Sequence, residues 1–209
     1  MSQHPTIECK PNGPYVVKDL GDLTSSQGTA VPTKPVIALC RCGGSASKPF
    51  CDGTHQKNGF SGARVAGSSG ASVDSYAAPG ITIHDNRSLC AHAGHCTDGL
   101  ASVFKYGSEP WIDPNGDTVA AIVNAIRNCP SGALTYSING VPGTDEHAPA
   151  ITITKDGPYA VAGSIALTDP TTGAAAPGAR YTLCRCGGSK NKPFCDGSHW
   201  DLKFHDEKN

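Results

Sequence analysis

Short apolar runs separated by turn residues occupy the first part of the chain and predict strands. One run starts at Ile7, and Pro-Asn-Gly-Pro at 11–14 predicts a turn into a second run, residues 15–17. A polar stretch, residues 21–35, leads to a third run, Val36-Ile37-Ala38-Leu39. Because each run is β-prone and too short for a helix, residues 6–60 are predicted to form a small β-rich unit.

An amphipathic helix is predicted near the middle of the chain, over residues 117–128. Its apolar residues recur at i, i+3, i+4 and i+7, as Val119, Ile122, Val123 and Ile126. We expect Asp117 to be the N-cap. A strand-like alternation at 81–83 and an apolar run at 133–138 flank the helix. Residues 80–140 are therefore predicted to be a separate α+β unit.

The last part of the chain repeats the first. Gly157-Pro158-Tyr159 repeats Gly13-Pro14-Tyr15, and the stretches between the units are small and polar, as in linkers. The predicted fold class is α+β, with two small β-rich units flanking a different domain. The units are the first repeat (6–60), the middle unit (80–140) and the second repeat (150–205), and the expected linkers are residues 61–79 and 141–150.

Composition favours a chain that needs covalent or metal cross-links. Leu, Ile, Val and Phe make up only 36 of the 209 residues, against 25 Gly and 16 Pro. The ten cysteines would form disulfides only in an oxidising compartment, and the N-terminus lacks the pattern of a signal peptide. The net charge of -1 and the lack of a long apolar stretch argue against nucleic-acid and membrane partners. We expect a cytoplasmic protein whose thiols bind metal.

A sixteen-residue stretch with three thiols and one imidazole occurs twice. The copies at 40–55 and 184–199 are identical at 13 of 16 positions, and matching residues are offset by 144. Thiolate and imidazole donors suit zinc or an iron–sulfur cluster. A helical turn would bring the last thiol and the imidazole, four residues apart, onto one face. The candidate ligands are Cys40, Cys42, Cys51 and His55 in the first copy and Cys184, Cys186, Cys195 and His199 in the second.

Both stretches resemble the CDGSH iron–sulfur family, whose pattern C-x-C-x2-S/T-x3-P-x-C-D-G-S/T-H they match in full. The resemblance implies one 2Fe–2S cluster per motif, with the first two cysteines on one iron and the third cysteine and the histidine on the other. Ser45, Gly43 and Gly44 are expected to offer hydrogen-bond donors to cluster sulfurs. The alternative is a structural zinc site, although C-x-C is tighter than the usual zinc spacing. Trp200, beside His199, is expected either to shield the cluster or only to pack.

Three further cysteines lie in the middle unit. Cys90, Cys96 and the Cys129-Pro130 pair, with the sequence CAHAGHC at 90–96, resemble a divergent monocluster ferredoxin domain. Position 93, where such ferredoxins have another cysteine, is alanine, so three thiolates suit a 3Fe–4S cluster. A 4Fe–4S cluster would need His92, His95 or the distant Cys9 as its fourth ligand. The alternative is that the cysteines are buried apolar residues of a domain without a cluster.

These observations favour electron transfer by a protein with two 2Fe–2S clusters and a further cluster in the middle unit. Storage of a cluster and its delivery to an apo-acceptor is the alternative. We expect no enzyme, because we find no dinucleotide-binding fingerprint and no hydrolase motif. The expected partner is a redox protein or an apo-acceptor. Family members that dimerise through paired strands also suggest a monomer in which the two repeats form an internal pseudo-dimer.

Overall fold

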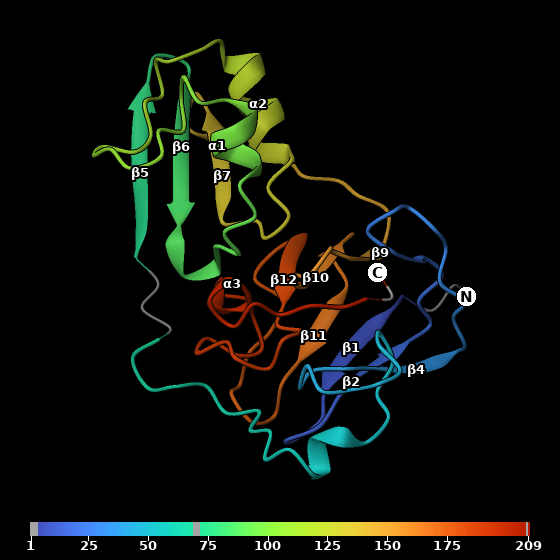
Figure 1. Ribbon diagram of the computed structural model, residues 1–209. Coiled ribbons are helices and arrows are strands. Elements are labelled where there is room, and N and C mark those ends of the chain that lie inside the picture. Colours follow the sequence, from blue (N-terminus) through green and yellow to red (C-terminus); the bar gives the residue numbers. More distant parts are fainter. Residues whose placement is uncertain (1–3, 69–71, 208) are drawn as a thin grey trace.

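The computed structural model describes residues 4–68, 72–207 and 209, which form three four-stranded sheets with a few short helices (Figure 1). This is the α+β class that the sequence predicts. The strands of the repeats are β1 (Thr6–Cys9), β2 (Tyr15–Lys18), β3 (Leu23–Thr24), β4 (Val36–Leu39), β9 (Ala150–Ile153), β10 (Tyr159–Ala162), β11 (Ala166–Thr168) and β12 (Arg180–Leu183). The middle unit contributes β5 (Val73–Ala78), β6 (Ile81–Asn86), β7 (Leu134–Ile138) and β8 (Val141–Pro142). The helices are the 3-10 turns η1 (Thr54–Gln56) and η2 (Arg87–Leu89) and the α-helices α1 (His95–Gly99), α2 (Val119–Arg127) and α3 (Ser198–Asp201).

The two repeats exchange one strand each. One sheet has the order β11-β1-β2-β4 and the other β12-β10-β9-β3. β3 of the first repeat pairs in parallel with β9 of the second, with Leu23 opposite Ile151. β11 of the second repeat pairs in parallel with β1 of the first, with Leu167 opposite Ile7. Leu23 and Leu167 occupy equivalent positions, so the exchange is reciprocal.

A single apolar core lies between the two exchanged sheets. The alternating strands β1, β2 and β9 turn every second side chain inward, as expected for sheets with one buried face. Tyr15 and Tyr159 meet edge to face in this core, with ring centroids 6.1 Å apart. Since residues of both repeats form one buried cluster, neither repeat can keep its apolar residues from water without the other.

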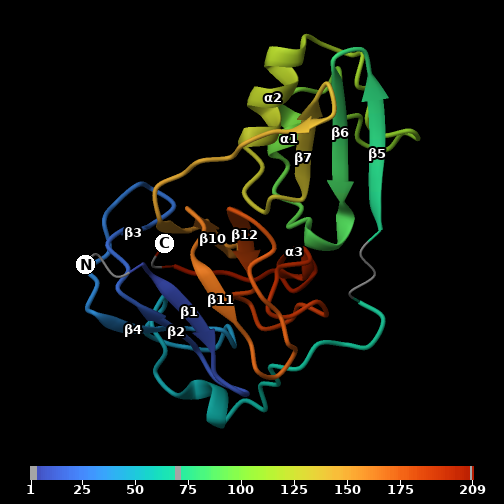
Figure 2. The ribbon, with the colours of Figure 1, turned by 180° about the vertical axis from the view of Figure 1, so that it is seen from behind.

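The middle unit is a β-meander covered on one face by α2 (Figure 2). The predicted helix is present and buries Ile122, Ala125 and Ile126. Its N-cap is Thr118 and not Asp117, because the Thr118 side chain accepts a hydrogen bond from the Ala121 N–H at 3.3 Å. Residues 73–78, expected to belong to a linker, form the edge strand β5 along the whole of β6. The prediction of a linker over residues 61–79 is therefore wrong for its second half.

In both views the middle unit lies at one end of the molecule, next to the second repeat, and the turn η1 of the first repeat lies at the other end (Figures 1 and 2). None of the helices in the described part of the chain has the length and hydropathy needed to cross a lipid bilayer.

Candidate functional site

The first motif brings its four predicted ligands together as two pairs. Strand β4 ends immediately before Cys40, whose Sγ lies 3.9 Å from the Sγ of Cys42. The turn η1 brings the Nδ1 of His55 to 3.4 Å from the Sγ of Cys51. The local fold thus presents a thiol–thiol pair from the end of a strand and a thiol–imidazole pair from a helical turn.

The second motif has the same geometry. The Sγ atoms of Cys184 and Cys186 are 3.8 Å apart, and the Sγ of Cys195 is 3.4 Å from the Nδ1 of His199. A tetrahedral metal bound at about 2.3 Å to sulfur and about 2.0 Å to nitrogen holds two sulfurs about 3.8 Å apart, and a sulfur and a nitrogen about 3.5 Å apart. Each pair therefore fits two ligands of one metal ion.

The pairs do not converge on one ion. Among the residues that the structure describes, no three His, Cys, Asp or Glu side chains gather closely enough to surround a single metal. Two pairs on separate centres are the arrangement that a binuclear cluster needs, with two donors on each iron. The donor set therefore fits a 2Fe–2S cluster better than one tetrahedral zinc ion.

Backbone N–H groups, and not the serine hydroxyl, face the thiols. The N–H of Gly53 donates to the Sγ of Cys51, and that of Gly188 to the Sγ of Cys186, each at 3.4 Å. The Ser45 hydroxyl instead donates to the carbonyl of Phe50 at 2.6 Å, whereas backbone N–H groups of Ser45 and Gly43 bond to the Cys40 thiol and lower its pKa against the effect of burial. N–H donors stabilise thiolates and tune the potential of a bound cluster.

Burial keeps two of the motif thiols, those of Cys40 and Cys195, protonated in the absence of a metal cation. It raises the pKa of Cys40 to about 11 and that of Cys195 to about 12. Burial also lowers the pKa of His199, so its imidazole is neutral near pH 7 and can act as a ligand. Binding of a metal cation would therefore release protons from the thiols.

Two tyrosines tie each motif to the opposite repeat. The Tyr15 hydroxyl lies 2.9 Å from the carbonyl oxygen of Cys184 and 3.1 Å from that of Pro193. The Tyr159 hydroxyl lies 3.0 Å from the carbonyl oxygens of both Cys40 and Pro49. Each ligand loop is thus held by a side chain from the other half of the chain. The sequence analysis missed this role, although both tyrosines stand in the repeated Gly-Pro-Tyr.

Buried ion pairs lie beneath both C-x-C segments. The Arg41 Nη2 is 3.1 Å from the Asp169 Oδ2, and neither side chain is exposed. Arg185 pairs with Asp206 of its own repeat. The acid that neutralises Arg41 follows β11, and therefore comes from the second repeat. The same arginine stands inside both C-x-C segments. This repetition could have indicated a buried ion pair, but the sequence analysis did not predict one.

The two motifs also touch through their backbones. A Cβ on Gly43 would overlap the carbonyl of Cys186, and a Cβ on Gly187 would lie 2.7 Å from the carbonyl oxygen of Cys42. Only glycine allows so close an approach. The two ligand loops are therefore in direct contact at Cys42 and Cys186.

The middle cysteines form a third group. Burial is the main cause that raises the pKa of the Cys96 thiol, and the nearby thiols of Cys129 and Cys90 raise it further. The Cys90 Sγ accepts a hydrogen bond from the His92 N–H at 3.4 Å. His92 lies in the loop after Cys90 and His95 is the first residue of α1; both are exposed, so either could supply a fourth ligand. Cys9 could not, because it is buried in the core of the two repeats.

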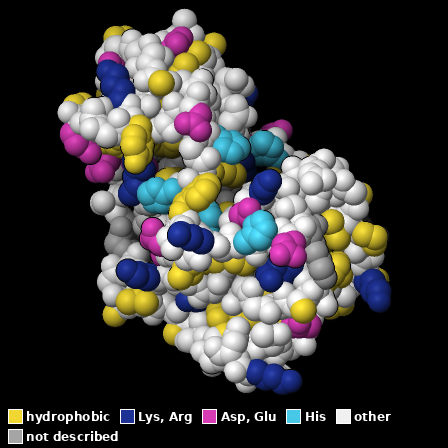
Figure 3. Space-filling model, in the orientation of Figure 1, with side chains coloured by type: hydrophobic (Ala, Val, Ile, Leu, Met, Phe, Trp, Pro, Cys, Tyr) yellow, Lys and Arg dark blue, Asp and Glu magenta, His cyan; other side chains and the backbone are white. Residues whose placement is uncertain are grey.

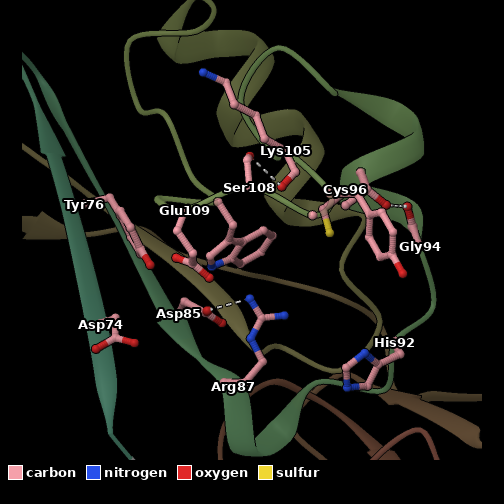
Figure 4. A pocket seen from close by; sticks show the side chains of 14 residues that line it. Asp74, Tyr76, Asp85, Arg87, His92, Gly94, Cys96, Lys105, Ser108 and Glu109 are labelled. Carbon is pink, nitrogen blue, oxygen red and sulfur yellow. Dashed lines mark hydrogen bonds and ion pairs between the residues drawn. The ribbon is translucent and has the colours of Figure 1, made fainter.

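An open cavity of about 700 Å³ borders this third group (Figure 4). Arg87 lies within it, 3.0 Å from Asp85 and with its guanidinium 4.0 Å from the centre of the Trp111 ring. The Nη1 of Arg87 is 3.8 Å from the Sγ of Cys90. Burial raises the pKa of the Cys90 thiol, and the Arg87 guanidinium beside it partly opposes that rise.

Sequence models of two families match the chain. The model described as an iron-binding zinc finger of CDGSH type matches residues 12–56 and 156–200. The chain belongs to the CDGSH iron-binding family. Between its two CDGSH domains, residues 76–139 match the model of a divergent 4Fe–4S mono-cluster domain. The protein is thus an iron–sulfur protein with a tandem CDGSH repeat and a ferredoxin-type domain between the copies.

The sequences of two curated proteins are similar to part of the chain. The uncharacterized protein YjdI of Escherichia coli K12 is 39% identical over 61 residues, which are 29% of this chain and 80% of the relative. The protein of the same name from Escherichia coli O157:H7 matches equally. No solved structure matches the chain.

The two CDGSH sites differ in exposure. In the first, Cys51 and His55 are half-buried; in the second, Cys195 is 2% exposed and His199 is 5% exposed. Lys192 is also buried, and its Nζ donates to the Ser189 carbonyl at 2.6 Å. The middle unit covers the second CDGSH site, and the first one is open.

Proposed function

We propose that this protein carries single electrons, with a 2Fe–2S cluster at each CDGSH motif held by three cysteines and one histidine. The ligands would be Cys40, Cys42, Cys51 and His55 in the first site, and Cys184, Cys186, Cys195 and His199 in the second. When bound, such clusters accept and release one electron at a time. The observation that carries the proposal is the pairing of the donors, at distances that suit two ligands per iron, in two sites whose loops are in contact.

The surrounding residues support a carrier because they hold both ligand loops in place. Tyr15 and Tyr159 bind the loop carbonyls, and Arg41 and Arg185 lie beneath the loops with their acids. Ligands fixed by such neighbours keep their geometry when the charge of the site changes. Contact between Gly43 and Cys186 provides a short route between the two sites.

The third group, Cys90, Cys96 and Cys129, is proposed to hold a 3Fe–4S cluster, or a 4Fe–4S cluster with a fourth ligand that is not cysteine. The match of residues 76–139 to the mono-cluster domain model, with Arg87 3.8 Å from the Cys90 Sγ, supports this assignment. The proposed partner is a redox protein, because a carrier of single electrons must exchange them with a donor and an acceptor. We propose a monomer in a reducing compartment such as the cytoplasm, acting without a substrate of its own.

The test is anaerobic purification followed by iron and acid-labile sulfide analysis, EPR spectroscopy and a redox titration. We expect about four irons for the two CDGSH sites and about three or four more for the middle unit. The colour should bleach reversibly on one-electron reduction and return when an oxidised partner is added. Colourless protein with zinc and no sulfide would refute the proposal and support a structural zinc module.

A second function, delivery of a cluster to an apo-acceptor, is favoured by one observation, the open first site. Its Cys51 and His55 can be reached from solvent, whereas Cys195 and His199 are covered. If delivery is the function, mixing with an apo-ferredoxin should move colour to the acceptor, first from the first site. A cysteine-to-serine variant of each motif would show which site donates. Colour that stays on this protein while electrons are exchanged would favour electron transfer.

A further inference from the structure

The loop that carries the middle cysteines rests on the second CDGSH motif. The side-chain amide of Asn191 donates to the carbonyl of Ser88 at 2.7 Å. A Cβ on Gly197 would lie 2.6 Å from the Cδ2 of His92, so the two loops are in tight contact. Leu89 packs against the core of the repeats and against that of the middle unit. Histidine side chains gather along this junction (Figure 3).

Within the described part of the chain, the first CDGSH motif makes none of these contacts. Gly53, equivalent to Gly197, has nothing within 4 Å of its Cβ position. The residues equivalent to Asn191 and Trp200, 144 positions earlier, are Ser47 and Gln56. Position 47/191 is one of the three at which the two sixteen-residue copies differ. The contact with the middle unit therefore gives a physical reason for one of the few differences between the copies.

A continuous set of contacts runs from the middle thiols to the second site. The His92 N–H donates to the Cys90 Sγ at 3.4 Å, and the Trp200 Nε1–H donates to the His92 carbonyl at 3.1 Å. The Trp200 ring then packs on the His199 ring, with centroids 5.1 Å apart and planes inclined by 37°. The His199 Nδ1 completes the second site with Cys195.

We propose that Trp200 is a bridge that couples the middle cluster to the second CDGSH cluster for electron transfer. The inference rests on the proposed function and adds the order in which the three sites pass an electron. One electron leaves the middle site, which is oxidised, and arrives at the second site, which is reduced; no proton or further reactant is consumed. A one-electron donor of low potential loads the middle site. The first site, in contact with the second through Gly43 and Gly187, is the exchange point with a partner.

The sequence analysis expected Trp200 either to shield the cluster or only to pack. A bridge between two sites is a third role for this residue. Its side chain is 62% exposed, so it contributes little to the core. Its Nε1–H is nevertheless directed at a backbone carbonyl of another domain, 108 residues away in sequence. An exposed indole that donates to His92, the neighbour of the Cys90 thiol, and packs on His199 is placed for coupling more than for burial.

The experiment compares the reconstituted wild-type protein with Trp200→Gln, which introduces the residue of the first copy. Gln56→Trp is the matched control, because it makes the reverse change where no middle unit is present. Iron and sulfide content would establish that all sites are loaded. Laser photoreduction would then follow the fast phase in which the second site is reduced as the middle site is oxidised. EPR of the reduced protein would record the magnetic interaction between the two centres.

We expect Trp200→Gln to lose the fast phase and to weaken the magnetic interaction, and Gln56→Trp to behave as wild type. Equal transfer in Trp200→Gln and wild type, with all sites loaded, would overturn the bridge and leave the carrier function intact. If Trp200→Gln fails to retain the second cluster, Trp200→Phe decides, since it keeps a ring and removes the N–H. Slowed transfer in that variant supports the bridge, and unchanged transfer overturns it. A wild-type protein without reducible clusters would instead refute the proposed function.

Discussion

Replacing Asp169 by alanine leaves the Arg41 guanidinium buried without its counter-charge. Both side chains are fully buried, and the Arg41 Nη2 to Asp169 Oδ2 distance is 3.1 Å. Arg41 also hydrogen-bonds to the carbonyls of Gly62 at 3.3 Å and Lys10 at 3.5 Å, and its guanidinium lies over the Tyr15 and Phe60 rings; none of these neutral groups replaces the carboxylate. Removing one partner of such a pair costs about 3–5 kcal/mol. Because Asp169 belongs to the second repeat, the variant tests whether the repeats stabilise each other.

The assay is urea denaturation under anaerobic conditions, followed by far-UV circular dichroism and by visible absorbance. With a urea dependence of about 2 kcal/mol per M, the expected loss lowers the midpoint by about 1.5–2.5 M. Asp201→Ala, at an exposed position, is the control and should change stability by less than about 0.5 kcal/mol. Arg41→Met combined with Asp169→Leu removes both charges and should recover most of the loss. A midpoint for Asp169→Ala within about 0.25 M of wild type would refute the reasoning.

Three further predictions concern the ligand loops. Tyr15→Phe and Tyr159→Phe should each destabilise the protein by about 1–3 kcal/mol in the same assay, because each leaves a loop carbonyl without its donor; no change in either would contradict the role given to these hydroxyls. His199→Cys should lower the potential of the second site in a redox titration, because thiolate adds one negative charge, and an unchanged potential would show that His199 is not a ligand. In cluster-free protein at pH 8, Cys195 should react with iodoacetamide about a thousandfold more slowly than a thiol of ordinary pKa, because burial raises its pKa from 9.0 to about 12. Urea should abolish this difference, and rapid labelling of Cys195 without urea would disprove the prediction.

The sequence predicted the parts that local pattern determines. The spacing within each motif indicated which donors would pair, and the 3.6-residue periodicity found α2. The exchange of β3 and β11 left little local signal, because β3 has only two residues and lies in a polar stretch. Its stability comes from pairing with β9 of the other repeat, which no local window contains. The small and polar composition of residues 61–79 predicts a linker, and β5 escapes detection because its side chains are mostly exposed and so lack an apolar alternation.

The contacts around the sites were also not predictable from one copy of the motif. Identical tyrosines and arginines in both repeats indicated importance, but their partners lie in the opposite half of the chain or in a different element. Lysine side chains are usually exposed, and the local sequence around Lys192 does not indicate that its side chain is buried. It is buried because the second motif is covered by other parts of the chain, among them Arg64, whose Nε donates to the Lys192 carbonyl at 2.9 Å.

The covalent connection between the two repeats has a consequence for how such a protein can specialise. A symmetric pair built from two identical polypeptides must carry the same amino acid at both equivalent positions, so any change made for a neighbour on one side is copied to the other. Here tryptophan stands at one position and glutamine at its counterpart, 144 residues earlier. Fusion thus lets one repeat adapt to the inserted domain while the other keeps its surface for transient binding partners.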